Sequence, residues 1–233
     1  MPQTIIPIAH IRTDFPEKFG LPRQSLLGNE LVGRVVLEHP YTVMDALRGI
    51  EQFSHLWLIW GFSAVPERGG FEPLVRPPRL GGNARVGVFA SRSPFRPNRL
   101  GLSLVRLERV DESGPSLIVS GIDLMDGTPI YDIKPYLPYA EALPDARGGY
   151  ADAHRDDRLE VDFPPALLAQ VPEAKRAALL QALALDPRPA YQDDPDRVYG
   201  FFFAGRNIRF RVRDRRLTVI DIQKPPQAAA DQP

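Results

Sequence analysis

The chain of 233 residues contains no cysteine. This absence excludes disulfide bonds, thiol nucleophiles and cysteine-ligated metal sites, and it fits a reducing compartment. No apolar run approaches the ~20 residues that a helix needs to span a bilayer. The N-terminal sequence MPQTIIPIAHIRTDF also lacks the basic region and the long apolar core of a signal peptide. We therefore expect a cytoplasmic protein that is not bound to a membrane.

The common catalytic motifs are missing as well. The sequence has no HExxH, no GxSxG and no P-loop, and no GxGxxG motif is placed to open a helix. A Rossmann-type nucleotide site is therefore not expected. The 4 histidines show no ligand-like spacing, so we also expect no bound metal.

Acidic residues are absent between Glu72 and Glu108, although the whole chain is neutral, with 29 basic and 29 acidic residues. The same stretch contains seven arginines, namely Arg76, Arg79, Arg85, Arg92, Arg96, Arg99 and Arg106. Because a guanidinium group matches the geometry of phosphate and carboxylate, this pattern favours a shaped anion-binding surface. The alternative interpretation is a solvated loop that is merely rich in arginine.

Proline and glycine are abundant, with 25 and 18 residues, so long helices are disfavoured. A short helix with a capping-box start is expected at 42–49. The segment HLWLIWGF (55–62) is so apolar that we expect a strand buried on both faces. Strands are predicted at residues 4–11, 33–37, 55–62, 85–90, 100–110 and 116–124. Many short strands joined by proline–glycine turns predict an antiparallel β-barrel.

The pattern changes near residue 143. A polar stretch leads to an alanine- and leucine-rich run at 165–185, which predicts a helical segment with Pro172 at a helix start. Strand-like segments follow at 198–204, 208–212 and 217–222. We therefore predict a mainly β protein. Its parts are a compact, non-Rossmann antiparallel β-barrel N-terminal domain (1–145), a small α+β C-terminal domain (158–223) and a disordered tail (224–233).

Reactive side chains crowd the segment GIDLMDGTPIYDIKPYLPY at residues 121–139. Its titratable members are Asp123, Asp126, Tyr131, Asp132, Lys134, Tyr136 and Tyr139. Polar groups beside the end of a strand are a common arrangement in active sites. The residues alone leave a second interpretation equally open, in which Asp126 shapes a turn and the tyrosines lie at the edge of the core.

Several segments resemble the TsaA-like family, whose characterised bacterial members, the TrmO group, are S-adenosylmethionine-dependent tRNA methyltransferases. The matching segments are LPRQS (21–25), FSHLW (53–57), VRPPRLGGNARVGVFASRSPFRPNRLGLSLV (75–105), DLMDGTPIYDIKPYLPYA (123–140) and DPRPAYQ (186–192). The resemblance implies a β-barrel that works as a homodimer. It also implies that S-adenosylmethionine is used to methylate N6 of threonylcarbamoyladenosine beside the anticodon of tRNA.

The resemblance further implies which residues bind the cofactor. These are Pro22, Arg23, Gln24, Arg92, Leu102, Ile122, Asp123, Leu124 and Met125, together with Ser63 and Ala64. Family members often have a histidine and another polar residue at the last two positions, so Ser63 and Ala64 are expected to contribute backbone contacts. The candidates for orienting N6 or receiving its proton are Asp126, Asp132, Lys134 and Tyr136.

Two other functions stay open at this point. A non-catalytic barrel could read anticodon loops through the arginine-rich face. A methyltransferase could instead use the same cofactor site on a small molecule. The acid-rich block DGTPIYDIKPY favours an enzyme, because a module that only binds RNA has no need of it. The concentrated positive charge favours RNA over a small substrate.

Overall fold

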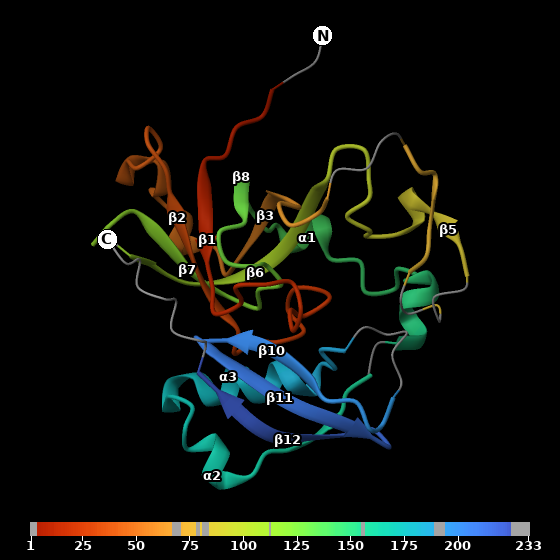
Figure 1. The fold of residues 1–233 in the computed structure, drawn as a ribbon. Helices are drawn as coiled ribbons and strands as arrows, with labels where there is room; N and C mark the ends of the chain where they lie inside the picture. Colours follow the sequence, from red (N-terminus) through yellow and green to blue (C-terminus); the bar gives the residue numbers. More distant parts are fainter. Residues whose placement is uncertain are drawn as a thin grey trace, which may run out of the picture.

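The computed structural model describes residues 4–66, 71–77, 80, 84–111, 113–154, 157–188 and 194–224. Its first part is a closed barrel in which antiparallel strands follow the order β1-β2-β7-β6-β3-β8 (Figure 1). These strands are β1 (Ala9–Arg12), β2 (Val32–Leu37), β3 (His55–Gly61), β6 (Leu100–Asp111), β7 (Ser116–Ser120) and β8 (Pro129–Pro135). The prediction of an antiparallel barrel is confirmed, although β8 was not among the predicted strands.

Alternation of side chains between two faces explains how these segments form a barrel wall. In β3, Leu56 and Leu58 point inward and are fully buried, while Trp57 between them is partly exposed. The prediction that residues 55–62 are buried on both faces was therefore wrong. The outward face of the strand is covered only in part, where Tyr136 packs edge-on against Trp57 with 6.1 Å between ring centroids.

A long excursion between β3 and β6, which we call the arm, carries most of the arginine-rich stretch. It contains the two-stranded sheet of β4 (Leu74–Val75) and β5 (Val86–Gly87) and stands out from the barrel on the right of Figure 1. The strand predicted at 85–90 was too long, because the chain turns into a 3-10 helix at Val88–Ala90. Of the arginines in this stretch, Arg79 lies outside the described residues.

Short helical turns connect other strands of the barrel. The segment predicted as one helix at 42–49 forms the 3-10 helix Met44–Leu47, and Gly49 with φ +84° separates it from a second 3-10 helix, Ile50–Gln52. No side chain caps the first of these, so the predicted capping box was wrong. Further turns are α1 (Pro138–Glu141) and the 3-10 helix Gly149–His154. Within the described residues, no helix is both long and apolar enough to cross a bilayer.

The C-terminal part combines helices with a sheet in the order β10-β11-β12-β9, in which β9 runs parallel to β12. Its elements are β9 (Glu160–Asp162), α2 (Pro165–Leu168), α3 (Glu173–Ala184), β10 (Tyr199–Phe203), β11 (Arg206–Arg213) and β12 (Arg216–Gln223). The predicted meander is confirmed. The helical segment predicted at 165–185 forms α2 and α3, and Pro172, which was predicted at a helix start, directly precedes α3. Proline disfavours the helical conformation of the residue before it, so the two helices are separate.

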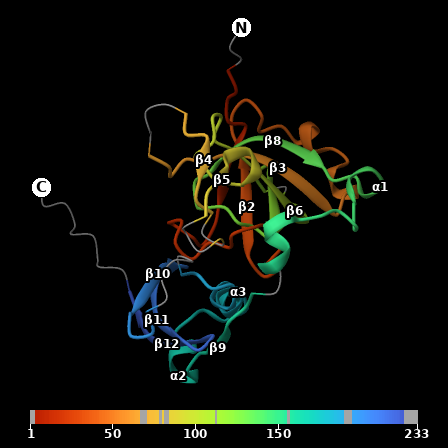
Figure 2. The ribbon, with the colours of Figure 1, turned by 90° about the vertical axis from the view of Figure 1, so that its right-hand side faces the viewer.

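One hydrophobic cluster joins the two parts of the chain. The connection between β1 and β2 turns toward the C-terminal sheet, where the ring of Phe15 packs edge-on against Phe203 with 5.1 Å between centroids. Gly20 lies so close to Phe201 that a Cβ atom would come within 2.3 Å of its ring. The C-terminal sheet accordingly lies beneath the barrel in both Figure 1 and Figure 2. The predicted domain boundaries at 145 and 158 stay a prediction.

Gly20 is expected to be essential for this packing. Its φ of +91° is one that other residues rarely adopt, and its missing side chain leaves room for the ring of Phe201. Gly20→Ala should lower the free energy of unfolding by about 1–3 kcal/mol, which urea denaturation measures.

Gly87→Ala is the matched control, because Gly87 has φ −58° and no atom lies within 4 Å of where its Cβ would stand. This substitution should change the free energy of unfolding by less than about 1 kcal/mol. Equal losses in the two variants would contradict the role assigned to Gly20.

Candidate functional site

A loop takes the place of a strand beside the first half of β6. The antiparallel ladder between β6 and β7 ends where Arg106 pairs with Ser120. Residues 21–25, which we call the cofactor loop, lie beyond that point. Ser25 Oγ in this loop accepts a hydrogen bond of 3.1 Å from the backbone N–H of Leu104 in β6. The loop therefore supplies a partner that the missing strand would otherwise have supplied.

The backbone of Leu102 faces the same side of β6. The bonds from Phe62 N–H to the Arg99 carbonyl and from Leu107 N–H to the Ser54 carbonyl fix which residues of β6 bond to β3. In an antiparallel ladder, residues that bond to one neighbouring strand alternate with residues whose N–H and C=O point away from it. Arg99 and Leu107 bond toward β3, so Leu102 belongs to the residues that point away from β3. Its backbone groups therefore point toward the cofactor loop.

A buried carboxylate lies beneath this loop. Ser103 Oγ donates a hydrogen bond of 2.6 Å to Asp123 Oδ1, and the indole N–H of Trp60 donates one of 2.9 Å to Ser103 Oγ. Burial raises the pKa of Asp123 to about 6, although the hydrogen bond from Ser103 and the positive charge of Arg92 act in the opposite direction. The ionised form of Asp123 is therefore unfavourable for folding in this position, and the hydrogen bonds from Trp60 to Ser103 and from Ser103 to Asp123 hold its carboxylate.

The structure thus brings together Gln24, Arg92, Leu102 and Asp123, which are far apart in the sequence. Gln24 Oε1 accepts a hydrogen bond from Arg92 Nη1, which ties the cofactor loop to the arm. Arg92 in turn acts electrostatically on Asp123, whose partner Ser103 directly follows Leu102. Hydrogen bonds and the charge of Arg92 thus link a guanidinium, an amide, backbone groups of β6 and a carboxylate at the edge of this strand.

Other predicted cofactor residues are placed so that only their backbone is available. The side chains of Ile122 and Leu124 are each 1% exposed and belong to the barrel core. Pro22 is also buried. The carbonyl of Met125 already accepts hydrogen bonds from the N–H and Oγ1 of Thr128, at 3.2 and 2.7 Å.

Three further predicted residues lie near the edge of this group. Ser63 and Ala64 are exposed in the turn that directly follows β3, at the end of the barrel where β6 begins. Arg23 points toward the C-terminal part, where its Nη2 donates a hydrogen bond of 2.9 Å to the Arg188 carbonyl.

Among the catalytic candidates, Asp126 has a clear structural role. Its Oδ1 accepts a hydrogen bond of 2.9 Å from the backbone N–H of Thr13, and its Oδ2 lies 3.4 Å from Nη1 of Arg12. Its own N–H bonds the carbonyl of Phe15 at 2.8 Å. These contacts fix the end of β1, as expected if Asp126 shapes the turn.

Asp132, Lys134 and Tyr136 follow along β8. Asp132 and Lys134 form an ion pair of 3.3 Å on the outward face, and Asp132 lies opposite Ile59 of β3. Ile59 lies opposite Leu102 on its other side. At the usual spacing of strands, Asp132 is therefore roughly 10 Å from the backbone of Leu102.

The structure does not gather all four candidates at one point. Asp126 precedes β8 and Tyr136 follows it, and this strand of 7 residues spans roughly 20 Å. Tyr136 instead joins an aromatic group with His55 and Trp57, at ring distances of 6.3 and 6.1 Å. A single reacting atom cannot contact both ends of this strand.

Ser25, Ser103 and Trp60 were not singled out as individual site residues by the sequence reasoning. A signal existed for Ser103, because it is a polar residue at an inward position of β6, where the other inward side chains are apolar. A fully buried hydroxyl of this kind requires a hydrogen-bonding partner. No comparable local signal pointed to Ser25 as the partner of β6.

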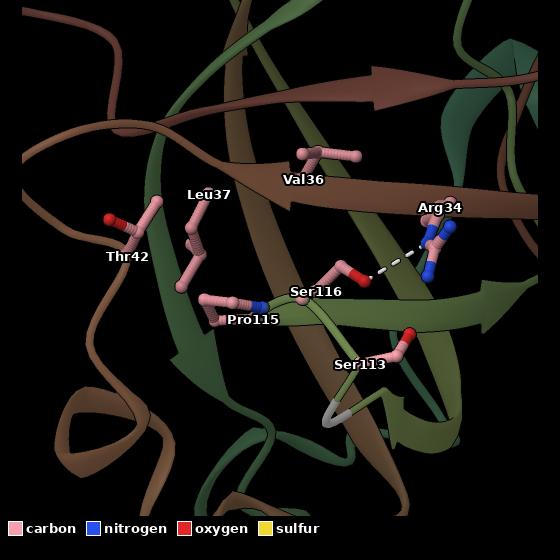
Figure 3. A pocket seen from close by; sticks show the side chains of 8 residues that line it. Arg34, Val36, Leu37, Thr42, Ser113, Pro115 and Ser116 are labelled. Atoms are coloured by element: carbon pink, nitrogen blue, oxygen red, sulfur yellow. Dashed lines mark hydrogen bonds between the residues drawn. The ribbon is translucent and has the colours of Figure 1, made fainter.

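A separate cavity of about 360 Å³ lies at another part of the barrel wall, between β2 and the turn that joins β6 to β7 (Figure 3). Arg34 Nε crosses one side of it to donate a hydrogen bond of 3.0 Å to Ser116 Oγ. The other residues that line it are Val36, Leu37, Thr42, Ser113, Gly114 and Pro115. None of the predicted cofactor or catalytic residues lines this cavity.

Known proteins match the chain over most of its length. Residues 10–142 match the family model of the tRNA-methyltransferase O N-terminal domain, and residues 156–225 match that of the TrmO C-terminal domain. The chain belongs to the TrmO family. Within the part that the structure describes, no group of three or more histidine or acidic residues is arranged to hold a metal ion in this TrmO-family chain.

Two relatives and one solved structure extend this TrmO assignment. The tRNA (adenine(37)-N6)-methyltransferase of Escherichia coli (strain K12) is 43% identical over 226 residues, which are 93% of this chain and 96% of the relative. The protein of the same description from Eikenella corrodens is 52% identical over 162 residues, covering 69% of this chain and 91% of its own. A crystal structure of TrmO shares the fold with a TM-score of 0.79 and 37% identity, over 96% of this chain and 100% of that one.

Asp123 is expected to destabilise this TrmO-family fold at neutral pH. The folded state holds its proton up to a pH of about 6, whereas the unfolded state releases it near 3.8, so stability falls as the pH rises between these values. Asp123→Asn should therefore raise the free energy of unfolding at pH 7.5, by up to about 3 kcal/mol. The gain should disappear near pH 4.

Urea denaturation of both proteins at the two pH values measures this difference. Asp132→Asn is the control, because it makes the same substitution at a side chain that is 46% exposed. An Asp123→Asn variant that is less stable than the parent at pH 7.5 would show that the carboxylate charge stabilises the fold.

Proposed function

We propose that the protein transfers a methyl group from S-adenosylmethionine to N6 of a tRNA adenine, with threonylcarbamoyladenosine beside the anticodon as the modified nucleoside. The observation that carries this proposal is the convergence of Gln24, Arg92, Leu102 and Asp123 at the edge of β6. The description of the Escherichia coli relative, tRNA (adenine(37)-N6)-methyltransferase, supports it. A Pseudomonas aeruginosa relative is described as a putative S-adenosylmethionine-dependent methyltransferase.

The groups at this edge fit the chemistry of the cofactor. S-adenosylmethionine carries hydroxyl and amino donors, a carboxylate and a positive sulfonium centre. We assign Asp123 to its donors or positive charge, because a buried charge needs a charged or hydrogen-bonded partner. We assign Arg92 to its carboxylate, because a guanidinium group matches the geometry of a carboxylate. The backbone of Leu102 and of residues 122–125 would hold the adenine. Gln24 would keep Arg92 in place through their hydrogen bond.

The protein's part in the reaction is to position N6 and accept its proton, because the cofactor supplies the electrophilic methyl group. The N6 lone pair is delocalised into the purine ring, so alignment is the main requirement. We propose Asp132 as the group that takes the proton, since it lies on β8, which only β3 separates from Leu102 in β6. Lys134 would hold the Asp132 carboxylate through their ion pair. Asp126 would shape the end of β1 instead.

The partly exposed aromatic group on the same face as this carboxylate suits an unpaired base. Tyr136 and Trp57 lie on the outward side of the barrel, and flipped bases in RNA loops are held by aromatic faces. We propose that this pair supports the anticodon loop while the target base enters the site.

The arm is proposed as the surface that meets the phosphates of tRNA. Its exposed residues Arg76 and Arg85 lie in a stretch without acidic residues. In the C-terminal sheet, Arg209 and Arg216 are already paired with Asp221 and Glu160. Phosphate contacts are therefore assigned mainly to the arm.

We also propose that the protein works as a cytoplasmic homodimer. Phe71 and Phe89 stack on the arm at 6.2 Å between ring centroids, and their exposed fractions are 57% and 73%. Large apolar side chains that are exposed in adjacent positions commonly mark an interface. A second copy of the chain would cover this pair.

The proposed reaction is tested with purified protein, S-adenosylmethionine and tRNA that carries threonylcarbamoyladenosine. Mass spectrometry of the nucleosides should show one added methyl group, and tRNA without the threonylcarbamoyl group should show whether that group is required. Binding of tRNA without binding of S-adenosylmethionine would favour a non-catalytic RNA-binding barrel. Binding of S-adenosylmethionine without methylation of tRNA would favour a small-molecule substrate.

Arg92→Ala should weaken the binding of S-adenosylmethionine by about ten- to a hundredfold, because it removes a charged partner from the site. Isothermal titration calorimetry measures this change. Arg109→Ala is the matched control, since Arg109 is an exposed residue later in β6 whose Nη1 lies 3.7 Å from Asp111. Similar effects of the two substitutions would show that Arg92 is only part of a solvated surface.

A further inference from the structure

The C-terminal part holds the segment that contains the cofactor loop at many points. Every one of these contacts falls on the connection between β1 and β2. The hydrogen bonds and ion pair are Lys175 Nζ to Asp14 Oδ2 (2.6 Å), Ala204 N to Asp14 O (3.0 Å), Phe202 N to Glu17 Oε1 (3.2 Å), Arg23 Nη2 to Arg188 O (2.9 Å), Arg158 Nη2 to Leu27 O (3.3 Å) and Glu30 N to Gln181 Oε1 (2.7 Å). The connection between β1 and β2 is thus held by the C-terminal part on both sides of the cofactor loop and at Arg23 within it.

One of these contacts reaches a predicted cofactor residue directly. Arg23 donates to the carbonyl of Arg188, and the next residue of the loop, Gln24, bonds Arg92 of the arm. Two neighbouring residues are therefore fixed from two sides, by the C-terminal part and by the arm. A change in either support would alter the direction in which the loop presents its polar groups.

The Arg188 carbonyl is itself held by a rigid corner after α3. Asp186 adopts φ +53°, and its Oδ1 accepts hydrogen bonds from the N–H of Arg188 at 3.2 Å and from its Nε at 2.9 Å. Asp186 Oδ2 accepts a further bond of 3.0 Å from Arg188 Nη2. Because a bidentate pair has a defined geometry, this corner sets the position of the carbonyl that Arg23 contacts.

We infer that the C-terminal domain forms part of the S-adenosylmethionine site, with Asp186 and Arg188 acting as positioning residues for Arg23 in the cofactor loop. This inference rests on the proposed function. It assigns to the C-terminal domain a role in cofactor affinity, in addition to any contact with RNA. Neither residue is expected to touch the cofactor.

The test compares single and double variants of the full-length protein by calorimetric titration with S-adenosylmethionine. Asp186→Gly keeps the left-handed backbone accessible and removes the carboxylate, so it should weaken binding by about ten- to a hundredfold. Asp186→Asn retains one acceptor and tolerates the same backbone conformation, so its loss should be smaller. The rate at saturating cofactor should stay near that of the parent, because the corner does not contact the reacting atoms.

Asp196→Asn is the matched control for Asp186→Asn. Asp196 also pairs with an arginine of the C-terminal part, since its carboxylate lies 2.9 Å from Arg213. Its side chain is 85% exposed, and its partner Arg213 lies in β11 and not in the cofactor loop. The affinity for S-adenosylmethionine should not change in this variant. A loss equal to that of Asp186→Asn would overturn the inference, since it would reflect a general effect of neutralising an acidic residue.

The double variant Arg23→Ala/Asp186→Gly decides whether the corner acts through Arg23. If it does, Arg23→Ala alone should lose as much affinity as the double variant. Additive losses would overturn the inference. Melting curves with and without cofactor show whether each variant is folded. If Asp186→Gly is not folded, Asp186→Asn takes its place. It is then compared with its control Asp196→Asn and combined with Arg23→Ala in the same double-variant test.

The outcomes separate this inference from the proposed function. Failure of the parent protein to bind S-adenosylmethionine would contradict the proposed function. Unchanged binding in Arg23→Ala would overturn only the inference, because the corner could then not act through Arg23. Weak binding in Arg23→Ala together with normal binding in a folded Asp186 variant would overturn only the role of the C-terminal corner.

Discussion

The hydrogen bond from Leu104 to Ser25 satisfies the edge of β6 at the point where a neighbouring strand is missing. The ladder with β7 stops at Ser120, and the cofactor loop takes over as the partner of the barrel wall. A loop held by a side chain leaves other backbone groups of the strand, such as those of Leu102, available to a ligand. The candidate site therefore exists because one part of β6 pairs with the strand β7 and the other part contacts the cofactor loop.

The second constraint is the charge that the barrel keeps beneath this edge. A buried carboxylate is unfavourable for folding, and Asp123 accepts a hydrogen bond from Ser103, whose hydroxyl in turn accepts one from Trp60. Functional sites often retain such groups at the expense of stability. The same residue that weakens the empty fold can stabilise a bound cation, so the two observations have one physical origin.

Local pattern was sufficient for the barrel but insufficient for the site. The two-residue period of β6 and the apolar run of β3 predicted strands, because the burial of a strand determines which of its successive residues are apolar. β8 was missed, since its polar side chains obscured the period. The grouping of Gln24, Arg92 and Asp123 joins segments far apart in the chain, and no periodicity encodes such a contact. Only the family resemblance indicated that these positions belong together. The start of α3 was predictable from Pro172, because proline favours the beginning of a helix and not its interior.

The contact between Arg23 and Arg188 joins residues that are 165 positions apart. During synthesis the barrel strands leave the ribosome long before the corner after α3 and the strands that follow it. The cofactor loop must therefore remain without its C-terminal support until almost the whole chain has emerged. A nascent or truncated chain would hold a barrel with an unfinished edge, so completion of translation and completion of the cofactor site coincide.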